Sequence, residues 1–130
     1  MKPQTFTIYC GPGTLWKCRV FIHPNLKSML RNRNRNKPQG KCSAFCRQFG
    51  VDDAWGKGDE RGFAAEMHFN RKSLKIDHIV HEAVHASIAW LKLVKLDVNT
   101  HTGDESFAES VEHLVCGTLW QLKQMKIKAL

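Results

Sequence analysis

His81, Glu82 and His85 form an H-E-x-x-H motif, which is the strongest chemical signal in the sequence. Two histidines spaced by four residues lie on one face of a helix, about one turn apart. Imidazoles at that separation can bind one tetrahedral Zn²⁺ ion, each at about 2.0–2.1 Å. Glu82 is next to the first ligand, so it can reach a metal-bound water and take its proton. The motif therefore predicts zinc-assisted hydrolysis with Glu82 as the general base.

A catalytic zinc site needs a third protein ligand, and the segment 103–113 offers acidic candidates. Glu105 and Glu109 are four residues apart, so a helix would place both on one face, which His113 extends. Glu105 lies twenty residues after His85 and is the favoured ligand, with Glu109 as the alternative. If Glu105 binds the metal, Glu109 is placed one turn further on to hydrogen-bond a ligand histidine.

Glu105 also has a purely structural interpretation. Thr102 and Glu105 match the capping-box pattern of a helix N-terminus, and in that case Glu109 becomes the third ligand. The longer metzincin motif needs Gly at position 88 and His at position 91. It is excluded because the sequence has Ile88 and Leu91 there.

Two further histidines could line the site. His78 precedes His81 by three residues and shares its helix face, so it could stabilise an oxyanion. A histidine at the rim of a polar site is an equally good interpretation. His113 has the same two interpretations on the following helix.

The elements that must hold these residues follow from the periodicity of apolar side chains. Residues 62–70 alternate, which predicts a strand. Apolar residues then recur at three- and four-residue steps over 73–94, which predicts a long helix carrying the histidine pair. A loop over 99–103 and a second long helix over 104–125, carrying the acidic candidates, complete this half. The other face or the edge of the 62–70 strand could pair with an extended peptide.

The first half of the chain is predicted to be a hairpin with loops. Strands are expected over 5–10 and 16–22, a short helix over 24–30, and loops over 31–40 and 51–62, with 43–49 ambiguous. Strands followed by a strand–helix–helix unit are typical of a small α+β layer fold. We therefore expect a short antiparallel or mixed sheet packed on the motif helix and the helix that follows it.

Composition limits the class of protein. The chain has 130 residues, 42% of them hydrophobic, which suits one core and a single domain over residues 1–130. It has no apolar run of about 18 residues, and its start lacks the apolar segment of a secretory signal. A membrane protein, a disordered tail and a multidomain enzyme are excluded, and we expect a cytoplasmic protein. The cysteines are an odd, scattered set, which predicts reduced thiols: Cys10, Cys18, Cys42, Cys46 and Cys116.

The formal net charge is +8, and a basic run begins at Arg31. The first interpretation of this run is a solvated loop. The alternative is contact with nucleic-acid phosphates. The run has no interleaved aromatic residues, which a base-stacking surface would show. The residues that would make the phosphate contacts are Arg31, Arg33, Arg35 and Lys37.

The motif and the residues after it resemble a known family. HEAVH followed by Asp-Glu105-Ser-Phe-Ala-Glu109 is similar to the gluzincin metallopeptidases, most of all to small phage-encoded members and more distantly to ImmA/IrrE-type proteases. The resemblance covers about residues 62–120. It implies a zincin-like domain with His81, His85 and Glu105 as zinc ligands and Glu82 as catalytic base. A phage-encoded member would act in the host cytoplasm. The family more often has Asp or Asn where this chain has Glu109.

Two functions are consistent with these features. The first is a zinc-dependent peptidase acting on a peptide or protein. The second is a zinc-stabilised basic binding module, associated with nucleic acid and without peptidase activity. Glu82 favours the enzyme because it is not a ligand, and a structural zinc site tends to have four protein ligands.

Overall fold

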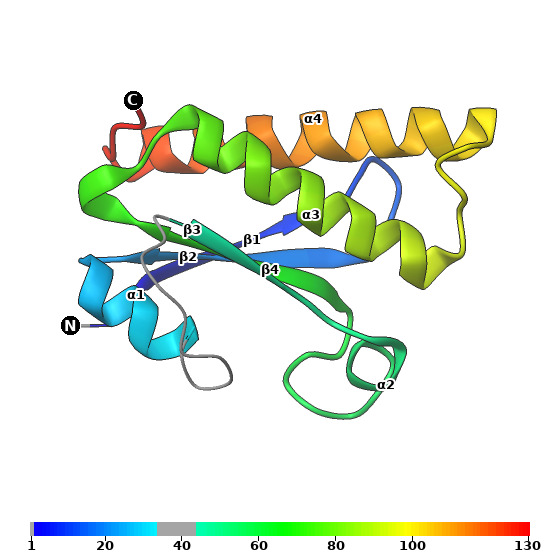
Figure 1. Ribbon diagram of the computed structural model, residues 1–130, viewed down its shortest axis with the longest axis horizontal. Coiled ribbons are helices and arrows are strands. Elements are labelled where there is room, and N and C mark those ends of the chain that lie inside the picture. The colour runs from blue at the N-terminus through cyan, green and yellow to red at the C-terminus, as the bar shows by residue number, and fades with distance from the viewer. Residues whose placement is uncertain (1, 34–43) are drawn as a thin grey trace.

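A four-stranded sheet with two long helices on one face forms the frame of the protein (Figure 1). The computed structural model describes residues 2–33 and 44–130. The predicted α+β class with a mixed sheet is confirmed. The elements, in chain order, are β1 (Gln4–Tyr9), β2 (Lys17–His23), α1 (Leu26–Arg33), β3 (Ala44–Gln48), α2 (Val51–Ala54), β4 (Phe63–Asn70), a 3₁₀ turn (Arg71–Ser73), α3 (Ile76–Val94) and α4 (His101–Gln124).

The strand order in the sheet is β1-β2-β4-β3. β1 is antiparallel to β2, β2 is parallel to β4, and β3 is antiparallel to β4. The strand predicted over 62–70 is therefore β4, and it is paired on both sides. Its edge is not free to pair with a peptide, so that part of the expectation is wrong. The edge strand next to β4 is β3.

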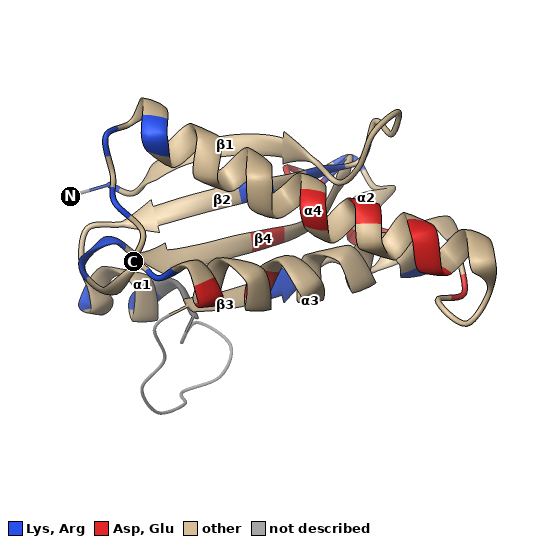
Figure 2. Cartoon of the chain, turned by 90° about the horizontal axis from the view of Figure 1, so that it is seen from above, with Lys and Arg blue, Asp and Glu red and all other residues tan. Residues whose placement is uncertain are grey.

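The core lies between the sheet and the two long helices. Val20 on β2 lies beside Met67 on β4, and Ile22 lies beside Phe69, and all four side chains are buried. α3 packs over β4 and β3, whereas α4 lies over β1 (Figure 2). Helix α1 covers part of the opposite face of the sheet (Figure 1). The two faces of β4 are thus both covered, and every residue of this strand is buried.

A short connection turns the chain from α3 into α4. α3 ends at Val94, and Lys95 takes the left-handed conformation with φ of 58°. Thr100 is the N-cap of α4, and its hydroxyl accepts a hydrogen bond from the Gly103 backbone N–H at 3.0 Å. A Cβ at position 103 would collide with the Asp97 carbonyl oxygen, so the turn requires glycine there.

Several element predictions need correction in the first half of the chain. The helix expected over 24–30 begins at Leu26 and continues to Arg33, so the start of the basic run is helical rather than a loop. The ambiguous segment 43–49 contains β3, and the loop expected over 51–62 begins with α2. Within the described part of the chain, no helix combines the length and the apolar character needed to cross a membrane.

Candidate metal centre

The two histidines of the motif project side by side from α3. His81 Nε2 and His85 Nε2 are 3.3 Å apart, and both side chains are exposed. Two nitrogens that bind one tetrahedral ion at about 2.0–2.1 Å would be about 3.3–3.4 Å apart. The pair therefore already has the separation that a shared zinc ion requires.

In contrast to the two histidines, Glu82 is buried, with only 6% of the residue exposed. Burial raises the pKa of its carboxyl group, and the neighbouring His81 opposes that shift. Burial of the Cys46 thiol on β3 raises its pKa, and the negative charge of Glu82 is the next largest cause, so the two side chains lie near each other. Glu82 thus lies under the histidine pair, on the side of α3 that faces the edge strand.

The edge strand β3 runs beside the histidine pair. Gln48 Nε2 donates a hydrogen bond to the His85 carbonyl oxygen at 3.1 Å, which ties the end of β3 to the motif helix. β3 pairs with β4 and stands last in the strand order. The site is therefore at the β3 edge of the sheet, whereas α4 lies toward β1 (Figure 2).

Helix α4 does not bring its acidic residues to the histidine pair. Ser110 Oγ donates to Ser87 Oγ at 2.8 Å, and this buried contact sets the antiparallel register of α3 and α4. Counting about 1.5 Å of rise per residue, Glu105 is about 10 Å further along the helix pair than His85. Among the described residues, only Glu82 joins the pair in a cluster whose possible donor atoms all lie within 4.8 Å of one another.

The other candidates from the sequence also lie elsewhere. Glu109 and His113 line a surface pocket together with Pro12 of the β1–β2 turn, on the side of α4 away from the pair. His78 is half-buried on α3, and its buried Nδ1 has no hydrogen-bond partner among the residues that the structure describes. It is outside the cluster of His81, Glu82 and His85.

The capping-box interpretation of Thr102 and Glu105 is wrong. Thr100 is the N-cap, and its side chain makes the capping hydrogen bond, so Thr102 lies inside α4. The chain has threonines at both 100 and 102, and it is the Thr100 hydroxyl that contacts both the Asp97 carbonyl oxygen and the Gly103 N–H.

The basic run and the cysteines are described only in part. Arg31 is exposed on α1, and Arg33 is the last residue of that helix, while Arg35 and Lys37 lie outside the described residues. Contact with nucleic acid stays a prediction. Cys42 also lies outside the described residues, and the other four cysteines are free thiols.

A second polar cluster on the sheet escaped the sequence interpretation. Glu66 and His68 alternate with apolar residues on β4, a pattern that is typical of a solvent-facing side. Both are buried, and His68 contacts Glu66 through one ring nitrogen and His23 of β2 through the other. The burial of this cluster depends on the pairing of β2 with β4, and no local sequence pattern reveals that pairing.

Comparison with known proteins adds no assignment. No protein-family model, no curated protein and no solved structure matches this chain. Any function must therefore be argued from the site itself.

Proposed function

We propose that the protein is a zinc-dependent peptidase with a zincin-like domain. The observation that carries this proposal is the 3.3 Å separation of His81 Nε2 and His85 Nε2, with the Glu82 carboxylate beside them. That separation suits two ligands of one tetrahedral ion. If the two histidines were only a solvated surface pair, nothing would offset the cost of burying the Glu82 carboxyl group beside them.

His81 and His85 would hold the ion, which would supply Lewis-acid polarisation of a substrate carbonyl and an acidified water. Catalytic zinc sites usually have three protein ligands, and among the described residues only the Glu82 carboxylate joins the two imidazoles, so the other positions on the ion would be open to water and substrate. Glu82 would accept a proton from the attacking water and return it to the leaving amine nitrogen. The gluzincin resemblance supports this role for Glu82.

The sheet supports a peptide substrate. β3 is an edge strand beside the histidine pair, and its backbone is linked to α3 by Gln48. An extended peptide could add to this edge through backbone hydrogen bonds, and its carbonyl groups would then pass close to the pair. In this proposal the peptide pairs with β3 instead of the 62–70 strand.

Metal analysis of the purified protein, with a peptide-library cleavage assay, tests the proposal. We expect one zinc ion per chain, and cleavage that stops with a chelator and returns with zinc. His81→Ala and His85→Ala should each lose the metal, whereas His101→Ala, at the exposed start of α4, should keep it. Full zinc occupancy in both motif variants would contradict the site. Zinc binding without any cleavage would instead favour the binding module.

A further inference from the structure

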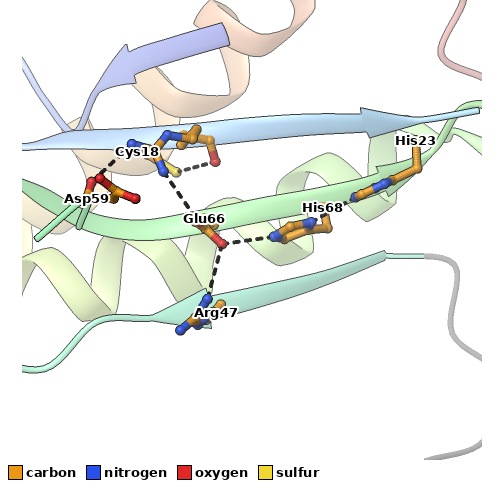
Figure 3. A network of polar contacts seen from close by, with 7 residues as sticks. Cys18, His23, Arg47, Asp59, Glu66 and His68 are labelled. Atoms are coloured by element: carbon orange, nitrogen blue, oxygen red, sulfur yellow. Dashed lines mark hydrogen bonds and ion pairs between the residues drawn. The ribbon is translucent and has the colours of Figure 1, made fainter. Parts of the chain in front are cut away.

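Glu66, His68 and His23 form a continuous chain of hydrogen bonds on the face of the sheet opposite α3 and α4 (Figure 3), called the Glu66–His68–His23 chain below. Glu66 Oε1 is 3.1 Å from His68 Nε2, and His68 Nδ1 is 2.9 Å from His23 Nε2. Glu66 is 7% exposed, His68 3% and His23 0%. His68 is stacked between Phe21 and Phe45, with ring centroids 4.4 and 4.3 Å away. Packing therefore holds the middle ring of the chain rigidly.

The protons in this chain can be placed from its charged end. Burial raises the pKa of Glu66, but the hydrogen bond from His68 and the charges of His68, Arg47 and Arg19 outweigh it, so the pKa is lowered. The ionised carboxylate accepts only, so His68 Nε2 carries a hydrogen. In a neutral chain His68 Nδ1 then accepts from His23 Nε2. His23 Nδ1 is then the one ring nitrogen of the two histidines with neither a hydrogen nor a hydrogen-bond partner among the described residues.

An additional proton therefore has one place to go. It must end on His23 Nδ1, whether the positive charge rests on His23 or passes to His68 beside Glu66. That nitrogen is buried, and it has no hydrogen-bond partner in the described structure. A buried N–H without an acceptor is unfavourable, so the proton-loaded chain does not suit this packing.

Among the described elements, helix α1 packs on β2 and β4 close to the His23 end of this hydrogen-bonded chain. His23 is the last residue of β2, and α1 begins at Leu26 and packs on β2 and β4 with Met29 fully buried. We propose that the Glu66–His68–His23 chain is a proton-sensitive latch, which keeps α1 docked on the sheet at neutral pH and releases it in acid. Water reaches His23 Nδ1 when α1 moves away.

The charged neighbours favour a latch centred on His23. Around the chain lie Arg19 on β2 and Arg47 on β3, both paired with Glu66, while α1 carries the exposed Lys27 and Arg31. The pKa of Glu66 is lowered, so this carboxylate holds its charge to a lower pH than usual. His23 is thus the group on which the latch depends.

The size of the effect follows from proton linkage. Burial, and then the charge of His68, lower the pKa of His23 from 6.5 to about 4. With α1 undocked the ordinary value returns, so the undocked form binds a proton more readily. The undocking equilibrium should then rise about 60-fold between about pH 7 and about pH 4.5.

Hydrogen exchange of the full chain at these two pH values, corrected for intrinsic exchange rates, tests the latch. We expect α1 amides to lose protection in acid while β4 amides stay protected. His23→Phe removes the titrating nitrogen and should abolish the pH effect on α1. His101→Gln, a change of an exposed histidine, should keep it.

The imidazole ¹⁵N spectrum of the wild-type protein provides a second measurement that does not depend on the variant folding. It should show neutral His23 with its hydrogen on Nε2 at about pH 5.5, well below the ordinary histidine pKa of about 6.5. Equal α1 protection at both pH values would overturn the latch. Loss of α1 and β4 protection together, or a charged His23 at about pH 5.5, would also overturn it.

Discussion

The register of α3 and α4 makes a sharp prediction about Glu105. The sequence favours this residue as the third zinc ligand, whereas the helix pair places it away from His85. Glu105→Gln removes the charge with little change in size. We expect this variant to keep its zinc affinity, and we expect His85→Ala to lose it.

The magnitude follows from distance. Ser110 on α4 contacts Ser87 on α3. Glu105 lies five residues from Ser110 toward the α3–α4 turn, and His85 lies two residues from Ser87 in the opposite direction. Their separation along the helix axes is therefore about 10 Å. A zinc–carboxylate bond needs about 2.0–2.2 Å. At about 10 Å in water, a divalent ion and one carboxylate interact by about 0.8 kcal/mol, and salt reduces this to a few tenths. The zinc affinity should therefore change by less than about twofold.

Chelator-competition titration measures this affinity, with His85→Ala as the positive control. His85→Ala removes one of two imidazoles, so its loss should exceed the roughly 10–100-fold typical of an outer hydrogen-bond partner. Glu109→Gln should behave like Glu105→Gln, because Glu109 lines a pocket near Pro12. A large loss of zinc in Glu105→Gln with an unchanged melting temperature would refute the helix register and restore Glu105 as the ligand.

Three further predictions concern the rest of the chain. Thr100→Ala should lower the free energy of unfolding by about 1 kcal/mol and the melting temperature by about 3–5 °C, whereas Thr102→Ala should change neither much. Calorimetry of both variants measures this, and the reverse order would place the N-cap at Thr102. Gly103→Ala should cost more, about 1–3 kcal/mol, because its Cβ meets the Asp97 carbonyl oxygen, and a neutral result would mean that the turn relaxes freely. If the basic run contacts nucleic acid, neutralising Arg31, Arg33 and Arg35 together should reduce the salt slope of binding by up to about three; salt-independent binding, or none at low salt, would leave the run as solvated surface.

Local pattern was sufficient for the elements that carry the motif. The alternation over 62–70 and the helical period over 73–94 gave β4 and α3 to within about three residues, because one face of each packs on the core. The prediction of the α3–α4 turn was less accurate, since the N-cap depends on how the folded turn brings the Thr100 hydroxyl against Asp97 and Gly103.

Features that depend on long-range contacts could not be predicted. The position of Glu105 follows from the Ser87–Ser110 contact, which joins residues 23 positions apart. The burial of Glu66 and His68 depends on β2, since His23 lies 45 positions from His68 in the sequence. Helical spacing alone put the acidic residues on one face of α4 without showing which way that face points.

Hydrolysis by the zinc-loaded Glu82→Gln variant tests the central proposal most directly. The variant keeps both imidazoles, so we expect the zinc content and melting temperature of the wild type. Its rate of peptide cleavage should fall by about 10²–10⁴-fold, because the proton acceptor is gone. Glu112→Gln, an exposed change on α4, should cleave at the wild-type rate. Unchanged cleavage by zinc-loaded Glu82→Gln would contradict the proposed role of the motif.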